Sequence, residues 1–319
     1  MTLDWPNHAD AWRVWREAMD GKRMHHGWIL AGKAGLGKHD FAEAAARELI
    51  GASPDVEQHP DILVLTYGPK DEKEERKRAE GKEWERARSI RIGQIREMQH
   101  RLTTRPTLGD KRVVIINPAD DMERNASNAL LKSLEEPPQG TYFLLVTHRP
   151  SRLLPTIRSR CRILRFPLLA DEQIALMLDE RMPGASGTAR DAALAAAAGS
   201  IGAAIAFIEQ DLGPLAQIMQ EIVSKGDPTL ELRARFAKAV GPRPDRPRMQ
   251  AVFDLARAIV TRTAIDASPE RQKVLIDVHS ELVTLSGQAP TYNFDAGLLV
   301  LEIGTLLARP AEASERADA

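Results

Sequence analysis

The chain has 319 residues, of which 43% are hydrophobic and 28% are charged, and this is enough material for two or three packed domains. The formal net charge of −1 gives no support to wholesale nucleic-acid binding, so any contact with DNA would come from a local patch or from a partner. Because no apolar run approaches the ~20 residues of a membrane span and the first residues lack the pattern of a leader, we expect a cytoplasmic protein without a membrane partner.

The first predicted strand, residues 28–31, leads into a phosphate-binding loop. The segment Gly32-Lys33-Ala34-Gly35-Leu36-Gly37-Lys38 has the glycine spacing and the lysine of a P-loop, and apolar residues then recur at helical spacing. The next position, which should carry a magnesium-binding hydroxyl, holds His39. Two interpretations stay open: Gly32, Gly35, Gly37 and Lys38 bind phosphate weakly, or the loop is a turn that packs helix against sheet without a ligand.

Further apolar runs predict four more strands, at residues 62–65, 113–116, 142–146 and 163–166. Amphipathic helices are predicted over residues 92–102 and after a cap at Asn125, the second ending at Pro137-Pro138. This alternation predicts an α/β fold with a parallel sheet. The run at 113–116 ends in Asn117-Pro118 where an acidic pair should hold magnesium, so the sequence predicts no metal site there.

Two charged regions lie between these strands. Residues 70–88 form a mixed-sign run with almost no apolar residue except Trp84, which predicts a solvated excursion or a surface helix, with a binding role as the alternative. Four arginines lie within or next to the next predicted helix. They favour a solvated face, while contact with the DNA backbone inside an assembly stays open: Arg91, Arg96, Arg101 and Arg105.

After residue 166 the pattern indicates helices only. A small helical unit precedes a boundary at Asp211-Leu212-Gly213-Pro214, and four or more helices follow, interrupted by a proline-rich loop at residues 241–247. We therefore predict three domains, at residues 1–166, 167–210 and 211–319. The last contains more apolar residues than one small bundle obviously needs, so we expect some of them to face partner subunits.

Three segments, in this order, carry a family resemblance over nearly the whole chain: the strand and loop from His26 to Lys38, the segment Asn128 to Pro138, and Ile157-Arg158-Ser159-Arg160-Cys161. Together they resemble bacterial clamp-loader subunits of the AAA+ class. The resemblance implies a RecA-like AAA+ domain, a small helical lid and an all-helical C-terminal domain that forms the collar of a ring. Many members also carry a four-cysteine zinc module, but residues 51–59 contain no cysteine, so zinc is not expected.

Within that family the altered loop and strand end point to the delta prime type of subunit in the DNA polymerase III holoenzyme. The resemblance implies a subunit without catalytic activity of its own that requires no cofactor. Its implied partners are the gamma/tau ATPase subunits, the delta subunit, the sliding clamp and primed DNA. Two alternatives stay open: an active ATPase of the gamma/tau type, against which the missing magnesium ligands argue, and a DNA-binding helicase-like ATPase, against which the lack of a DNA-reading domain argues.

The resemblance also implies roles for single residues. Arg160 would be an arginine finger that acts in trans on the nucleotide of a neighbouring subunit, and the alternative is an arginine that pairs with a carboxylate. Thr147, at the end of the predicted fourth strand, matches a phosphate-sensing position, with a strand-end hydrogen bond as its default role. Glu135 and Glu136 either end a helix or face a neighbouring subunit.

Overall fold

The computed structural model describes residues 5–21, 24–53, 58–289 and 295–317. Its chain divides into two compact units, Met1–Leu168 and Leu169–Ala319. The predicted fold class is confirmed, because the first unit contains a parallel sheet with helices and the described part of the second unit is helical. The finer division of the second unit into a lid and a collar stays a prediction.

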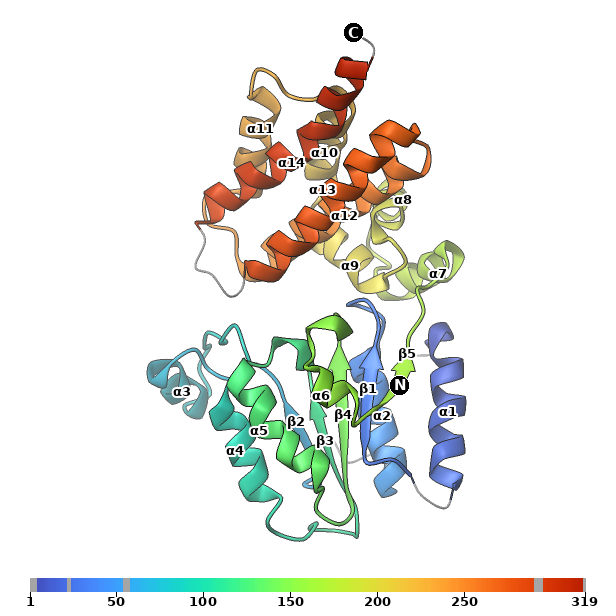
Figure 1. Ribbon diagram of the computed structural model, residues 1–319, viewed down its shortest axis with the longest axis vertical. Coiled ribbons are helices and arrows are strands. Elements are labelled where there is room, and N and C mark those ends of the chain that lie inside the picture. Colours follow the sequence, from blue (N-terminus) through green and yellow to red (C-terminus); the bar gives the residue numbers. More distant parts are fainter. Residues whose placement is uncertain (1–4, 22–23, 54–57, 290–294, 318–319) are drawn as a thin grey trace. The chain divides into compact units, whose positions relative to one another are not determined.

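Five parallel strands form the sheet of the first unit, in the order β2-β3-β4-β1-β5 (Figure 1). All five lie within one or two residues of the predicted runs: β1 Gly27–Ala31, β2 Ile62–Leu65, β3 Arg112–Ile116, β4 Thr141–Thr147 and β5 Arg162–Arg165. The register pairs Ala31 with Thr147, so that the carboxyl ends of β1 and β4 meet at one edge of the sheet. In open parallel sheets this edge is where ligands bind.

Helices cover both faces of this sheet, which explains why its central strands are continuous apolar runs. Ile29 belongs to the core under α4 (Ile92–Arg101), α5 (Arg124–Glu135) and α6 (Pro155–Arg158). The neighbouring Trp28 points to the other face, where its ring lies 5.4 Å from that of Trp15 in α1 (Ala9–Asp20). α2 (Lys38–Ile50) packs against the sheet on this second face (Figure 1).

The predicted cap of α5 was wrong. The helix begins at Arg124, and the carbonyl of Glu123 accepts its first backbone hydrogen bond from Ser127. Asn125 therefore lies inside the first turn and caps nothing. The helix ends at Glu135, before Pro137, as the sequence predicted.

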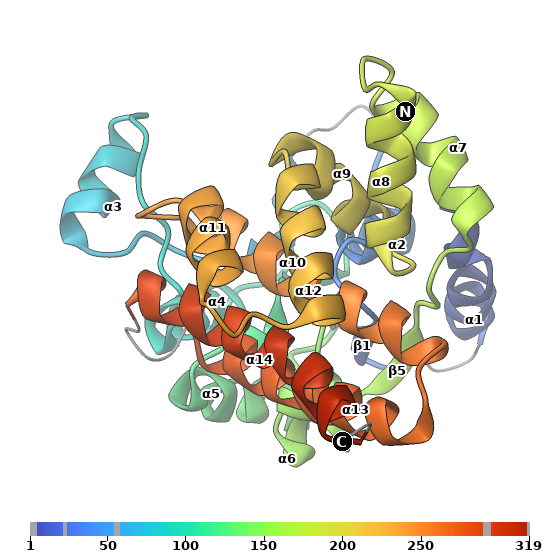
Figure 2. The same ribbon diagram turned by 90° about the horizontal axis from the view of Figure 1, so that it is seen from above.

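The charged run at residues 70–88 contains a short surface helix, α3 (Glu72–Ala79), which the Asp71 side chain caps by accepting the N–H of Glu74 at 3.0 Å. An antiparallel bridge between Pro69 and Arg86 closes the excursion at its base. In both views α3 lies on the side of the first unit that is remote from α1 (Figure 1, Figure 2).

The second unit is described as eight helices: α7 Asp171–Arg181, α8 Gly187–Ala197, α9 Ile201–Glu209, α10 Gly213–Lys225, α11 Glu231–Val240, α12 Arg246–Ile265, α13 Pro269–Gln288 and α14 Ala296–Ala317. α12 packs against α13, and α14 packs against both α10 and α13. The proline-rich loop separates α11 from α12 as expected. No helix in the described ranges is long and apolar enough to cross a membrane.

Candidate functional site

The glycine-rich loop joins β1 to α2 at the carboxyl edge of the sheet, which is the strand-loop-helix context that a P-loop requires. Gly37 precedes the first residue of α2 and has a φ of 70°, a left-handed conformation that favours glycine. A Cβ atom at this position would also collide with the indole of Trp5. The fold therefore keeps the backbone turn of a phosphate-binding loop and lays an aromatic ring directly against it.

The lysine of the loop faces the protein and not an open phosphate site. Lys38 is 2% exposed, and its Nζ donates a hydrogen bond of 2.5 Å to the carbonyl oxygen of Lys33 within the same loop. Burial lowers the pKa of Lys38 to about 8, and the charge of Asp120 partly opposes this shift. The ammonium group that would hold phosphates in an active site is thus bound by its own loop.

A segment at the start of the described chain covers the loop. The Nε1 of Trp5 donates to the Asp40 carboxylate at 3.1 Å, and the ring of Trp5 stacks on that of His8 at 5.2 Å. The Nε2 of His8 donates to the carbonyl oxygen of Leu36 at 2.8 Å. Burial lowers the pKa of His8, which favours the neutral ring. Trp5 lies directly before the 3-10 helix η1 (Pro6–His8), and His8 is the last residue of this helix. Together they cover the loop from one side.

Acidic residues are present beyond β3, but three residues later than a magnesium site needs. Asn117-Pro118 follows the strand, and the 3-10 helix η2 (Ala119–Asp121) then brings Asp120 under the loop. Asp120 is 6% exposed, and its carboxylate accepts the N–H of His148 at 2.9 Å and the Nε of Arg149 at 3.3 Å. Burial opposes its ionisation, but the His148 and Arg149 groups outweigh this and hold the pKa of Asp120 below its ordinary value.

The second acidic residue is also bound by protein groups. Asp121 accepts a hydrogen bond of 2.5 Å from the hydroxyl of Tyr67 and another of 3.3 Å from Nη2 of Arg149. No group of three or more His, Cys, Asp or Glu side chains in the described ranges is arranged to hold a metal ion. Residues 54–57 of the cysteine-free segment 51–59 lie outside those ranges.

Thr147 lies where the sequence predicted it, at the end of β4 beside the loop. It is fully buried, and its Oγ1 accepts the N–H of Arg149 at 3.2 Å and shares a hydrogen bond with Asp120. The next residue, His148, is half-buried, and loss of solvation together with the nearby charge of Lys38 lowers its pKa to about 4. The structure thus brings Lys38, Thr147 and Asp120 together at one edge of the sheet.

His39 occupies the first turn of α2, and its Nε2 lies 3.5 Å from Oε1 of Glu43 one turn later. It contributes no hydroxyl to the loop, as its residue type dictates. The loop therefore lacks a hydroxyl ligand at this position, and the acidic side chains nearest to it already bind protein groups.

Arg160 lies at the opposite end of the sheet from Lys38. It follows α6 and precedes β5, and its carbonyl oxygen is 3.2 Å from the position that a Cβ on Gly27 would occupy, at the amino end of β1. The five residues of β1 separate this end from the loop by about 13 Å. The guanidinium pairs with Glu135 at the end of α5, with 2.7 Å between Nη2 and Oε1.

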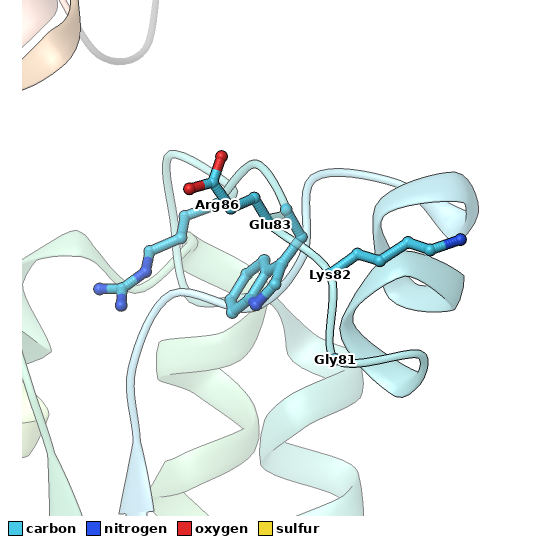
Figure 3. Close-up of a pocket in the computed structure, with 5 residues that line it drawn as sticks. Gly81, Lys82, Glu83 and Arg86 are labelled. Carbon is cyan, nitrogen blue, oxygen red and sulfur yellow. The ribbon is translucent and has the colours of Figure 1, made fainter.

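The charged excursion at residues 70–88 carries a shallow surface hollow. A hollow of about 430 Å³ is lined by Gly81, Lys82, Glu83, Trp84 and Arg86. Figure 3 shows that the side chains of Lys82 and Arg86 extend away from each other. The guanidinium groups of Arg78 and Arg86 lie 5.6 and 5.7 Å from the centre of the Trp84 ring, so the indole already makes cation-π contacts within the excursion.

The four arginines of the α4 region are all exposed, in agreement with a solvated face: Arg91, Arg96, Arg101 and Arg105. One of them is tied to the excursion, because Nη2 of Arg91 donates to the carbonyl oxygen of Lys70 at 2.7 Å. Contact of this face with DNA stays a prediction.

Sequence reasoning missed four contributors to the site: Trp5, His8, Asp120 and His148. The aromatic pair carried no sequence signal, because its contacts bring together residues about 30 positions apart. Asp120 had a sequence signal, since an acidic pair begins four residues beyond the predicted end of the third strand. The prediction missed it because it did not include the turn that returns those carboxylates to the sheet edge.

The comparison with known proteins matches the part of the chain that contains this site. Residues 7–170 match the family model described as DNA polymerase III, delta subunit. The DNA polymerase III subunit delta' of Pseudomonas aeruginosa is 34% identical over 206 residues, which cover 58% of this chain and 58% of that protein. The subunit delta' of Escherichia coli K12 is 33% identical over 204 residues, covering 59% of this chain and 56% of that protein.

Among solved structures, a DNA polymerase III gamma subunit-related protein from Thermotoga maritima aligns with a TM-score of 0.46 at 18% identity, covering 94% of this chain and 98% of that one. In both sequence comparisons the match spans less than two thirds of the length of the relative.

Proposed function

The chain belongs to the DNA polymerase III delta-subunit family, and from that premise we propose that it is the delta prime subunit of a bacterial clamp loader. In this proposal the chain does not hydrolyse ATP. It joins gamma/tau ATPase subunits and a delta subunit in the cytoplasm, and supports the ATP-dependent loading of a sliding clamp onto primed DNA during replication.

The environment of Lys38 is the main support for the proposal that the chain does not hydrolyse ATP. Its buried ammonium group donates a hydrogen bond of 2.5 Å to the Lys33 carbonyl, and burial lowers its pKa to about 8. Transfer of a γ-phosphoryl group needs a lysine on the phosphates and a magnesium ion that bridges them. A lysine held by its own loop, followed by His39 in place of a hydroxyl, supports a loop that has lost this chemistry.

The cover of the loop supports the same conclusion. Trp5 lies against Gly37, where the backbone would have to approach a phosphate chain. His8 donates a hydrogen bond to the carbonyl oxygen of Leu36. A phosphate chain that approached the backbone on this side of Gly37 would meet the indole of Trp5. We therefore propose that the chain needs neither nucleotide nor metal for its role.

Arg160 would act on the nucleotide of a neighbour. It lies at the amino end of β1, about 13 Å along the strand from the chain's own loop, so it does not serve that loop. A guanidinium is permanently charged and can donate parallel hydrogen bonds to phosphate oxygens, which stabilises charge in the transition state. Arg160→Lys should therefore lose most of the activity that Arg160→Ala loses in a reconstituted loader, whereas a charge-only role would be kept by lysine.

The assay that tests the non-hydrolysing proposal uses the purified chain in a steady-state ATPase measurement. We expect no turnover above background, in the chain and in a Lys38→Ala variant alike. Turnover near 1 per second, about the lower end for phosphoryl-transfer enzymes, that disappears in Lys38→Ala would contradict the proposal and favour an active ATPase of the gamma/tau type.

A further inference from the structure

We propose that Glu135 is a positioning residue for Arg160: its carboxylate holds the guanidinium in the orientation from which it reaches the nucleotide of the neighbouring subunit. The inference rests on the proposed trans action of Arg160. It assigns a role to an acidic residue for which the sequence left two interpretations open, that it ends a helix or that it faces a neighbouring subunit.

Three groups of the same chain fix the guanidinium. Nη1 of Arg160 donates to the carbonyl oxygen of Thr156 at 2.9 Å and to Oγ of Ser159 at 3.3 Å. Nη2 lies 2.7 Å from Oε1 of Glu135. The first two partners lie within four residues of Arg160, so they hold the side chain only against its own turn of the chain. Glu135 comes from another helix and is the contact that ties the guanidinium to the body of the fold.

The pair remains open to a partner. The Arg160 side chain is 34% exposed and that of Glu135 is 49% exposed, so a neighbouring subunit could approach the guanidinium without unfolding this chain. A guanidinium has five N–H donors, and the three contacts leave others for phosphate oxygens. A preorganised arginine loses less side-chain entropy when it meets the transition state than a free one does.

The position of Glu135 is unfavourable for the helix that carries it. Glu135 is the last residue of α5, where the negative end of the helix dipole repels a carboxylate. Alanine is also the better helix former. Removal of the side chain should therefore not destabilise α5, which makes Glu135→Ala a clean probe of positioning. Glu136 follows in the chain, is equally near the helix end and has no side-chain contact among those described, so Glu136→Ala is the matched control.

The test is a double-mutant cycle in a loader reconstituted from this chain, gamma/tau and delta subunits, with DNA-stimulated ATPase activity as the readout and assembly checked by gel filtration. Arg160→Ala sets the largest loss that this site can show. We expect Glu135→Ala to lower kcat by about two- to fivefold at the affected site, the range for one partly exposed ion pair, without changing KM for ATP. In the Arg160→Ala background the same substitution should have no effect, and Glu136→Ala should behave as wild type.

Three other outcomes would overturn the positioning role of Glu135. If Arg160→Ala lowers activity but Glu135→Ala does not, the finger stands and the positioning role is wrong. Equal losses from Glu135→Ala with and without Arg160 would mean that Glu135 acts independently of the arginine, and would also overturn it. Wild-type activity from a fully assembled Arg160→Ala complex would reject the finger itself, and the role of Glu135 with it.

Discussion

Lys38 illustrates how a single buried charge is kept in this fold. An unpaired ammonium group in a protein interior is costly, and here the Lys33 carbonyl and the charge of Asp120 offset part of the cost. Asp120 is in turn held by donors from residues 147–149. The cluster therefore balances its charges with backbone and side-chain groups of the chain itself.

The lowered pKa of Lys38 predicts a pH dependence of stability. Between about pH 8 and 10.5 the folded lysine has lost its proton while the unfolded lysine keeps it, so the free energy of unfolding should rise with pH over this window. Below pH 8 both states are protonated, and the cost of burying the charge is fully present. Lys38→Met should remove this rise, which is on the order of 3 kcal/mol.

Urea unfolding of the full chain from pH 7 to 10.5 measures this difference. The same substitution at Lys132, which is exposed on α5, is the matched control and should leave the rise in place. An identical pH dependence for Lys38→Met and wild type would show that Lys38 is not the buried charge described here.

The strands and helices show which parts of the fold could be predicted from sequence. β1, β3 and β4 are buried on both faces, so their apolar runs located them within two residues. The start of α5 was misplaced, because Asn125 resembles a cap but the helix begins one residue earlier without a side-chain cap. Arg160 was predicted from its motif, while its pairing with Glu135 depends on tertiary contact between α5 and the turn after α6.

The connection between β2 and β3 contains a buried ion pair that should be essential for stability. Asp61, just before β2, is fully buried and accepts the N–H groups of Thr107 and Leu108 at 2.7 and 2.9 Å. Nη2 of Arg112, the first residue of β3, lies 3.2 Å from the same carboxylate. Asp61→Ala should lower the free energy of unfolding by about 3 to 5 kcal/mol, because it leaves Arg112 buried without its counter-charge.

Thermal or urea unfolding checks this value, and Asp110→Ala, an exposed aspartate before β3, is the control that should stay near wild type. The additional change Arg112→Met should recover part of the loss, since it removes the unpaired charge. Wild-type stability of Asp61→Ala would mean that the pair contributes nothing to the connection.

The collar prediction can now be restricted to particular leucines. Most of the apolar residues that suggested a partner face are buried in the second unit, including Val252, Leu255 and Ile303. Two on α14 are exposed, Leu298 at 67% and Leu301 at 45%. We expect the variant with both changed to serine to fold as wild type but to weaken assembly with gamma/tau subunits by at least about tenfold, because it removes apolar surface from the proposed interface.

Leu176 of α7 is exposed to the same extent as Leu298, so Leu176→Ser is the matched control and should assemble normally. Analytical ultracentrifugation over a range of concentrations measures both variants. Undiminished assembly of the α14 variant would exclude these leucines from the interface.

The sequence predicted a change from an α/β region to a helical region at residue 166, and the chain divides into two compact units after Leu168; the three predicted domains stay a prediction. The change from alternating strands and helices to helices alone carries that information in the pattern itself. The contacts that surround the loop were not predictable in the same way. Trp5 reaches Asp40, and Asp120 reaches Arg149, only after the sheet has brought distant segments to one edge.

Purification of a tagged chain from its native cell is the most direct test of our proposal that this chain works inside a clamp loader. We expect gamma/tau ATPase and delta subunits to be recovered together with the chain, in a complex that survives gel filtration. Recovery of the chain alone, or with recombination proteins in place of polymerase III subunits, would contradict it.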